Sequence, residues 1–393
     1  MPLDDDVTGL LDLIEPAMVA IRHDLHAHPE LSFAEFRTSE VIRQRLDELG
    51  WQVEDCPTDT GAVASLEGQS GRHVMIRADI DALPVTEETD LDFASETSGV
   101  MHACGHDVHT ASVLGVADLL ARRRDAGNLV GRFTLVFQPA EEGLGGARVM
   151  VERGLLENRS IDYVIGAHVS SLAPVGVVGS RAGIVMSEVN AFSILLEGTG
   201  GHGAMANVAG NVVLAVSSLP ARLGEVVEGL SYEGTDCACA AGVINAGSAP
   251  NVVPRRASLQ GTLRTFTGAQ RDEALARLDA LVASTARDYE VSARLVLSES
   301  APAVVNDADV VGVVADTLAH VPGVTYLEMP PVTPSDDVSE FLARVPGCYL
   351  FVGGAPADGS GGMHHSPDFV VLDESCRVFA EVLTRGALAL ARR

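Results

Sequence analysis

The sequence contains no apolar run that approaches the ~20 residues needed to cross a bilayer. Its first residues, MPLDDDVTGLLDLIEP, are acidic, whereas a secretory signal begins with basic residues. Its six cysteines are scattered at positions 56, 104, 237, 239, 348 and 376, which is not the pattern of a disulfide framework. These absences predict a soluble, cytoplasmic protein with no membrane partner.

Positive charge is also scarce, because 27 Lys and Arg residues stand against 54 Asp and Glu residues. The resulting net charge of −27 repels phosphate backbones and argues against a nucleic-acid partner. The length of 393 residues exceeds that of one ordinary core and favours two domains. The 39 glycines suit an α/β protein with many tight turns between strands and helices.

Apolar strands and amphipathic helices alternate in the first half of the chain. Strands are expected at residues 73–80, 133–137 and 163–169, each followed by a turn and most by a helix. This alternation predicts an α/β fold with a mostly parallel sheet and helices on both of its faces. The pattern becomes α+β near residue 187 and returns to α/β near residue 299. We therefore expect a discontinuous catalytic domain, residues 1–186 and 299–393, with a smaller α+β domain, residues 187–298, inserted into it.

The stretch Met101–Thr110, MHACGHDVHT, gathers five side chains that could bind a metal ion: His102, Cys104, His106, Asp107 and His109. Thiolate, imidazole and carboxylate groups are the ligands that zinc and similar transition metals prefer in proteins. The alternative is a polar loop with structural histidines, in which Asp107 is the N-cap of the following helix.

Further candidate ligands follow the expected strands: Asp79 and Asp81, then Glu141 and Glu142, then His168, with His364 and His365 near the end of the chain. The carboxyl ends of strands are where open α/β sheets bind ligands. So many candidates exceed the needs of one tetrahedral zinc and favour two metal ions, which can activate a water and polarise a carbonyl group. A carboxylate that is not a ligand must then move the proton, and the Glu141–Glu142 pair offers one of each kind.

The motifs ADIDALP, MHACGHDVHTA, FQPAEEG, the segment around His168, GTGGHGAM, NVVP, GTLRTF, SDD and HHSPDF occur in this order. Together they resemble the M20 metallopeptidase/amidohydrolase family over nearly the whole chain. The resemblance is strongest to its aminoacylase-like branch of hippurate hydrolases, N-acyl-amino-acid deacylases and indole-acetyl-amino-acid hydrolases.

The resemblance implies a role for each matching residue. The implied metal ligands are Cys104, His106, Glu142, His168 and His365, the last preferred over its neighbour His364. Glu141 would be the general base that activates the water and then protonates the leaving nitrogen. Asp81 and Asp107 would orient imidazoles, and the role of Asp79 stays open.

The inserted domain would, by the same resemblance, act as a lid and form the dimer. His202 in its GGH turn would stabilise the oxyanion of the tetrahedral intermediate. Asn251 and Arg264 would hold the substrate, although Arg264 could equally be an ordinary charge on a strand surface. The chain departs from the family pattern at Ala206 and Asn207, where proline and histidine are usual, and this weakens what the resemblance implies about substrate preference.

The sequence thus predicts a metal-dependent hydrolase of N-acyl amino acids or related amides. It would bind two divalent transition-metal ions (zinc, manganese, cobalt or nickel) and form a homodimer or homotetramer through the inserted domain. One alternative is a metallo-carboxypeptidase or dipeptidase that uses the same site on short peptides. Another is a metal-independent amidase in which Cys104 is the nucleophile and His106 the base.

Overall fold

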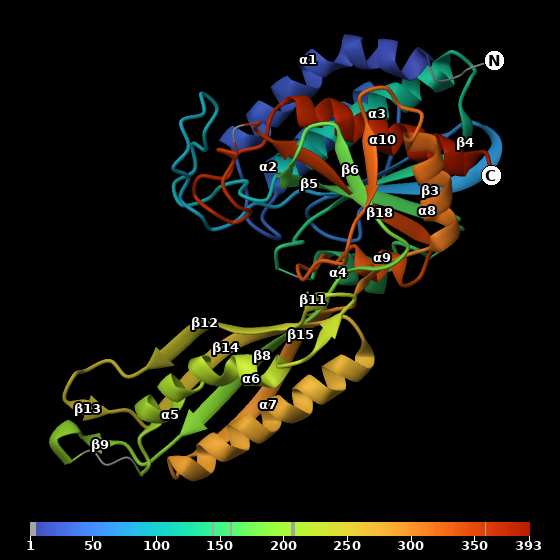
Figure 1. Ribbon diagram of the computed structural model, residues 1–393. Helices are drawn as coiled ribbons and strands as arrows, with labels where there is room; N and C mark the ends of the chain where they lie inside the picture. Colours follow the sequence, from blue (N-terminus) through green and yellow to red (C-terminus); the bar gives the residue numbers. More distant parts are fainter. Residues whose placement is uncertain (1–4, 144, 158, 206–208, 358) are drawn as a thin grey trace. The chain divides into compact units, whose positions relative to one another are not determined.

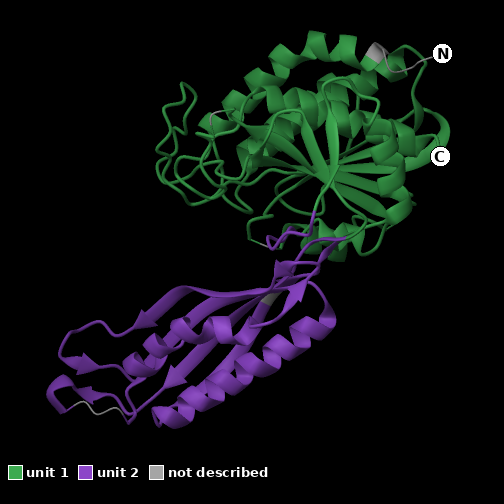
Figure 2. Cartoon of the chain, in the orientation of Figure 1, with its two compact units in different colours: residues 1–183, 305–329, 337–393 green, residues 184–304, 330–336 purple. Residues whose placement is uncertain are grey.

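The computed structural model describes residues 5–143, 145–157, 159–205, 209–357 and 359–393, and two compact units divide the chain (Figure 2). Unit 1 comprises Met1–Gly183, Val305–Met329 and Asp337–Arg393, and unit 2 comprises Ile184–Val304 and Pro330–Asp336. The predicted boundaries lie after residues 186 and 298, and the prediction assigns residues 330–336 to the larger domain. These residues lie with unit 2, where the backbone N–H of Ser187 donates to the carbonyl oxygens of Val332 and Pro334.

Unit 1 is built on a mixed sheet with the strand order β1-β2-β4-β3-β5-β18-β6-β17 among the described residues. The strands are β1 Gln52–Glu54, β2 Ala62–Glu67, β3 Gln69–Asp79, β4 Val130–Gln138, β5 Tyr163–Pro174, β6 Val177–Ser180, β17 Thr325–Glu328 and β18 Gly347–Ala355. The four central strands, β4, β3, β5 and β18, run parallel. They are covered on both faces, which explains why they read as continuous apolar runs in the sequence. The expected mostly parallel sheet is confirmed.

Helices cover both faces of this sheet (Figure 1). They are α1 Asp5–Ala27, α2 Phe36–Glu48, α3 His106–Asp125, α4 Gly146–Glu152, α8 Ala308–Leu318, α9 Ser339–Leu342 and α10 Glu374–Ala391. In Figure 1, α1, α3 and α10 lie on one side of the sheet, and the short helices α4 and α9 lie together on the other. Helix α3 is buried on nearly all sides, because α1 and α10 pack against it above the sheet. Its N-terminal residues are therefore held within the core.

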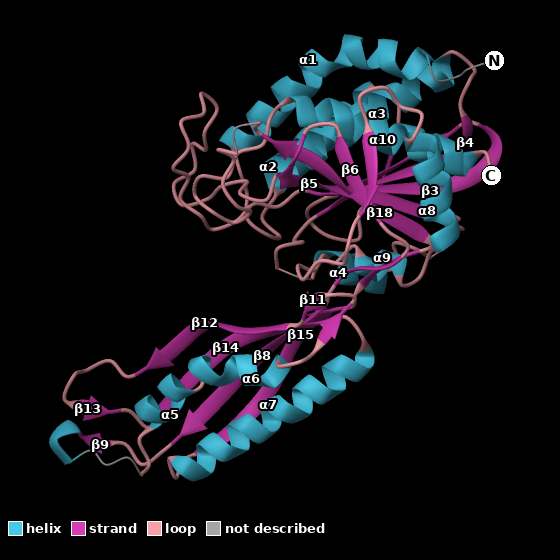
Figure 3. Cartoon of the chain, in the orientation of Figure 1, coloured by secondary structure: helices cyan, strands magenta, loops and turns pink. Residues whose placement is uncertain are grey.

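Unit 2 is an antiparallel sheet with helices on one face (Figure 3). Its main strands, in the order β12-β14-β8-β15, are β8 Glu188–Glu197, β12 Ala238–Ala246, β14 Arg256–Thr265 and β15 Ser292–Ala301. Its helices are α5 Val212–Ser218, the 3-10 turns η1 Gly203–Met205 and η2 Pro220–Arg222, α6 Leu223–Val227 and α7 Gly268–Asp288. Apolar side chains such as Ile194, Leu259 and Leu278 form its core. Helix α5 ends before Pro220, because proline lacks the N–H that a helix interior requires.

The remaining strands are short: β7 Gly183–Met186, β9 Gly201–His202, β10 Ser231–Tyr232, β11 Thr235–Asp236, β13 Val252–Val253 and β16 Val304–Asn306. Of these, β9 and β13 pair with each other and carry the GGH turn. Among the described helices, none combines the length and the apolar character needed to cross a membrane.

Candidate metal centre

The candidate ligands meet at the carboxyl ends of the parallel strands of unit 1. Asp79 ends β3, the Glu141–Glu142 pair follows the end of β4, and His168 lies on β5. Cys104 and His106 come from the loop that leads into α3 and from its first residue. Since the strands are parallel, their carboxyl ends share one edge of the sheet, and segments far apart in the sequence come together there.

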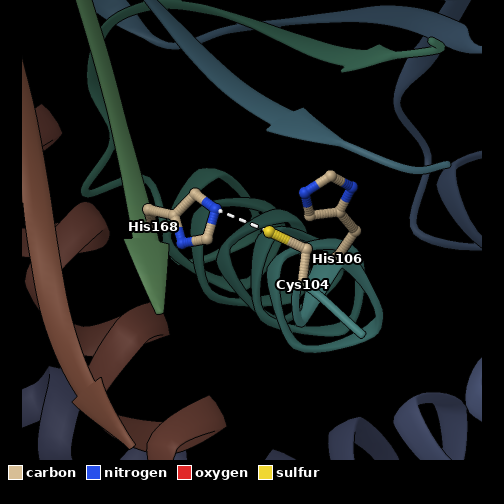
Figure 4. Close-up of side chains that lie close together, drawn as sticks. All are labelled: Cys104, His106 and His168. Atoms are coloured by element: carbon tan, nitrogen blue, oxygen red, sulfur yellow. Dashed lines mark hydrogen bonds between the residues drawn. The ribbon is translucent and has the colours of Figure 1, made fainter. Parts of the chain in front are cut away.

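Cys104, His106 and His168 point toward one another at this edge (Figure 4). The Cys104 Sγ atom lies 3.4 Å from His168 Nε2, and the ligand atoms of all three residues lie within 4.8 Å of one another. Each imidazole is oriented by a backbone carbonyl group. His168 Nδ1 donates to the oxygen of Val169 at 2.6 Å, and His106 Nδ1 donates to that of Asp81 at 2.8 Å. These bonds leave the Nε2 lone pair of both rings facing the centre.

Carboxylates complete the arrangement. His106 Nε2 lies 3.9 Å from Glu142 Oε1 and 4.0 Å from Glu141 Oε2. The other Glu142 oxygen, Oε2, lies 3.4 Å from His365 Nε2. The ligand atoms of Cys104, Glu142 and His365 also lie within 4.8 Å of one another. The thiol of Cys104 thus belongs to two adjoining groups of ligands, which is an arrangement that suits a pair of ions.

Two buried atoms indicate that this set of donors fits a cation. His106 Nε2 and Glu142 Oε1 have no hydrogen-bond partner among the described residues. A buried polar atom without a partner is costly, and native structures contain few of them. A metal ion would satisfy both atoms, and the mixture of sulfur, imidazole nitrogen and carboxylate oxygen is one that zinc-like transition metals prefer.

The negative charge of the carboxylates at the centre also favours the binding of a cation. Burial and the charges of Glu142 and Glu141 hold the pKa of the Cys104 thiol well above its usual range. Burial acts to lower the pKa of His106, but Asp79 and the other nearby carboxylates raise it to about 10. A reactive thiolate needs electropositive surroundings. The surroundings of Cys104 are the opposite, which argues against the metal-independent cysteine amidase.

Asp81 acts mainly on the Glu141–Glu142 turn. Its carboxylate accepts the backbone N–H groups of Glu141 and Glu142, each at 3.1 Å, and the hydroxyl of Ser32 at 2.6 Å. The His106 imidazole is oriented by the carbonyl oxygen of Asp81, with the carboxylate farther away at 3.4 Å from Nδ1. The family resemblance implies that the Asp81 carboxylate orients an imidazole, but here the backbone carbonyl group of the same residue does so.

Asp79, whose role the sequence left open, is fixed by buried partners. It accepts a hydrogen bond from His109 Nδ1, and Arg77 donates to it at 2.6 Å. His109 Nε2 accepts the backbone N–H of Val169 at 2.8 Å, so His109 ties β3 to β5. Burial opposes ionisation of Asp79, but Arg77 and the imidazoles of His106 and His109 hold its pKa well below the usual range. A permanent negative charge therefore lies 3.8 Å from His106 Nε2.

Asp107 is not the helix N-cap that the sequence suggested. Gly105 takes the cap position, with φ of +88° and no side-chain cap. Asp107 instead accepts hydrogen bonds from Arg22 Nε at 3.1 Å and from His26 Nδ1 at 3.0 Å. It therefore orients an imidazole, as expected, but one that belongs to α1 and not to the metal centre. No sequence signal identifies Arg22 and His26, because both lie about 80 residues away from their partner.

His364 and His365 both approach the centre, but in different ways. His364 Nε2 accepts the backbone N–H of Ser171 at 3.3 Å, and its Nδ1 lies 3.7 Å from Cys104 Sγ. Burial and the neighbouring histidines lower the pKa of His364 to about 4. His365 adopts φ of +67° and turns its Nε2 toward Glu142. Because its ring nitrogen faces Glu142, His365 is favoured over His364 as the metal ligand.

The predicted residues of unit 2 lie at two separate places in that unit. His202 on β9 is exposed, its Nδ1 accepts the N–H of Ala204, and its strand pairs with β13, which follows the exposed Asn251. Arg264 lies near the C-terminal end of β14, where it donates to the hydroxyl of Ser335 at 2.6 Å. The unusual positions 206 and 207 lie outside the described residues.

Comparison with known proteins agrees with this geometry. The sequence matches the family described as Peptidase family M20/M25/M40 over residues 75–389. It is 36% identical to the N-acetyl-L-cysteine deacetylase of Bacillus subtilis, with 94% of this chain and 87% of the relative covered. It is 37% identical to thermostable carboxypeptidase 1 of Saccharolobus solfataricus, with 96% and 94% covered.

A solved structure from Bacillus subtilis, described as a dinuclear metal binding peptidase from the M20 family, is also similar to this chain. The two share 30% sequence identity and superimpose with a TM-score of 0.78, over 96% of this chain and 98% of the other.

Proposed function

The chain belongs to the peptidase family M20/M25/M40 and is a metal-dependent amide hydrolase, and we propose that it hydrolyses N-acyl amino acids or closely related amides. The observation that carries the proposal is the Glu141–Glu142 pair at the end of β4. Glu142 turns a buried, unpaired oxygen toward His106 and its other oxygen toward His365, as a ligand would. Glu141 lies beside this group with its backbone N–H held by Asp81.

The proposed ligands for two divalent transition-metal ions are Cys104, His106, Glu142, His168 and His365. Two such ions would polarise the substrate carbonyl and lower the pKa of a water molecule. Zinc, manganese, cobalt and nickel all suit these donors. The backbone carbonyl groups of Asp81 and Val169 accept hydrogen bonds from Nδ1 of the two imidazoles, so that Nε2 is the ring atom that would bind a metal ion.

Glu141 is the proposed general base and then general acid. It would take the proton of the attacking water and return it to the leaving amine nitrogen, because an amine leaves only when protonated. Its position at the rim of the ligand group supports this role, since Oε2 lies 4.0 Å from His106 Nε2. Asp81 fixes the backbone of the same turn and so limits the directions in which Glu141 can point.

Unit 2 is the proposed lid, with His202 stabilising the oxyanion and Asn251 and Arg264 binding the substrate. Within one unit, His202 and Arg264 lie near opposite ends of β14, whose eight steps from Arg256 to Arg264 span roughly 26 Å. A small substrate cannot reach both residues of one copy. We therefore propose that His202 and Asn251 act on the active site of a second copy, so that a homodimer or a homotetramer is the active form. The cytoplasmic location stays a prediction from the sequence.

The N-acetyl-L-cysteine deacetylase relative supports an acylated amino acid as the substrate. A second candidate, carboxypeptidase or dipeptidase activity, is supported by the thermostable carboxypeptidase relative. Both activities would use the same ligands and the same base. They differ in what is joined to the nitrogen of the released amino acid. In an N-acyl amino acid it is a simple acyl chain, and in a peptide it is another amino acid.

A substrate panel tests the proposal directly. N-acetyl, longer acyl and aromatic acyl amino acids would be compared with dipeptides, each with zinc, manganese, cobalt or nickel. We expect kcat/KM for the preferred acyl amino acid to exceed that for any dipeptide by about tenfold or more. The reverse order would establish the peptidase activity, and Glu141→Gln protein serves as the control for contaminating hydrolases.

A further inference from the structure

The residue that precedes the proposed base has an unusual backbone conformation. Ala140 has φ of +54° and no exposed surface. A residue with a Cβ atom rarely adopts this left-handed conformation, and it persists only where surrounding contacts fix it. The carbonyl oxygen of Ala140 accepts the backbone N–H of Gly146 at 3.2 Å, which fixes one side of the residue.

The other side of Ala140 is held by a buried carboxylate that the proposed mechanism does not use. Glu35 Oε1 accepts the backbone N–H of Ala140 at 2.9 Å, and Glu35 Oε2 accepts the hydroxyl of Thr60 at 2.7 Å. Glu35 has no exposed surface and lies immediately before α2, about 105 residues from its partner in the sequence. Burial of a carboxylate is costly unless hydrogen bonds compensate it, and here both oxygens are used.

Glu35 and Asp81 together hold three consecutive backbone amides. Glu35 accepts the amide of Ala140, while Asp81 accepts those of Glu141 and Glu142. The segment between α1 and α2 is joined to both carboxylates, because Ser32, three residues before Glu35, donates its hydroxyl to Asp81. The carboxylates of Glu35 and Asp81, both from the N-terminal part of the chain, therefore fix the left-handed turn that leads into the Glu141–Glu142 pair.

We propose that Glu35 is a positioning residue for the general base, an inference that rests on the proposed role of Glu141. By fixing Ala140 in its left-handed conformation, Glu35 sets the direction of the Glu141 side chain while Glu142 stays at the ligand group. Glu35 acts through the backbone of Ala140 and does not itself touch substrate or metal. Small displacements of a catalytic group lower the rate without unfolding the protein.

Two substitutions at one position test this role. Glu35→Leu removes both acceptors, whereas Glu35→Gln keeps an acceptor for the Ala140 N–H and can donate to the Thr60 oxygen. We expect Glu35→Leu to lower kcat by about 10- to 100-fold, with KM and bound metal unchanged and with the acid limb of the pH–rate profile displaced. Glu35→Gln should restore kcat to within about threefold of wild type. Thr60→Val, which spares the bond to Ala140, is the matched control and should also stay within about threefold.

A double-mutant cycle shows whether Glu35 acts through Glu141. In a Glu141→Gln background, Glu35→Leu should cause no further loss of kcat, because the group that it positions is already absent. Losses that multiply in the double variant would overturn the proposal. So would a Glu35→Leu protein whose activity falls only in proportion to its folded fraction or its metal content, with an unchanged pH profile.

Failure of the positioning role can be told apart from failure of the proposed function. If the wild-type enzyme hydrolyses dipeptides and not acyl amino acids, the substrate assignment is wrong, and the same variants and the same cycle are measured with the dipeptide. If wild-type turnover of acyl amino acids is normal and Glu35→Leu retains it, the substrate assignment holds and the positioning role is wrong.

Discussion

In unit 1 the candidate ligands Cys104 and His106 are buried, although His365 is exposed, whereas in unit 2 both His202 and Asn251 lie on the surface. His106 is fully buried, with one nitrogen bonded to a backbone carbonyl group and the other facing the carboxylates. The His202 ring accepts a hydrogen bond from the backbone N–H of Ala204, two residues away in its own turn. Unit 1 therefore presents a preorganised site, while unit 2 presents groups that need a partner surface.

The difference reflects the chemistry that each set is expected to perform. Metal ligands must be held rigidly and desolvated, and a sheet edge with α3 packed into the core provides that rigidity. Residues of a lid must reach a substrate that arrives from solvent, so they have to remain accessible until the site closes.

Removal of metal should abolish activity and should lower the stability of unit 1 alone. Exhaustive chelation is expected to reduce turnover to background, and readdition of zinc, manganese, cobalt or nickel should restore it. The loss of bound ions should lower the melting temperature of unit 1, because binding to the native state stabilises it, and leave unit 2 unchanged. Metal content, activity and calorimetry measure these effects. Full activity in metal-free protein would instead favour the cysteine amidase.

Glu141→Gln should separate chemistry from metal binding within unit 1. We expect kcat to fall by about 10²- to 10⁴-fold, because the proton can no longer be taken or returned, while KM and metal content stay near wild type. Glu142→Gln is the matched variant, and its main effect should be a lower metal content. If Glu141→Gln also lost its metal, the division of roles between the two neighbouring glutamates would be wrong.

His202→Ala should lower kcat by about 10²- to 10³-fold without changing metal content, because it removes an oxyanion donor. Mixing it with Glu141→Gln protein tests whether His202 acts on a second copy. Random mixed dimers should regain about a quarter of wild-type activity, since half of them are hybrids and each hybrid has one complete site. No recovery on mixing would place His202 and Glu141 in the same copy.

The His26–Asp107 contact is expected to make the stability of unit 1 depend on pH. Burial acts to lower the pKa of His26, but Asp107 and Glu87 raise it to about 9, above the unfolded value of ~6.5. A raised pKa contributes stability that is complete below pH ~6.5 and is lost as pH rises through about 9, amounting to at most about 3 kcal/mol.

The melting temperature of metal-loaded wild type, compared with His26→Asn from pH 6 to 10, measures this contribution. The advantage of wild type should be largest at pH 6 and should shrink as the pH rises past 9. A difference that does not change with pH would mean that the contact stabilises by packing and not by charge.

Continuous apolar runs predicted β3, β4 and β5, because strands buried on both faces exclude polar residues. Strands such as β2 and β12 were missed. β2 is short, and β12 is largely exposed and rich in alanine, so neither shows a clear alternation.

The sequence predicts which residues would bind metal and move the proton, because soft donors and paired carboxylates at the ends of apolar strands have few structural uses. How these side chains are held could not be predicted and follows from the tertiary contacts. The contacts from Glu35 to Ala140, from Asp81 to Glu141 and Glu142, and from Asp107 to His26 join residues some 60 to 105 positions apart. Such pairs leave no periodic trace in a sequence, since the sheet and the packed helices alone bring them within hydrogen-bonding distance.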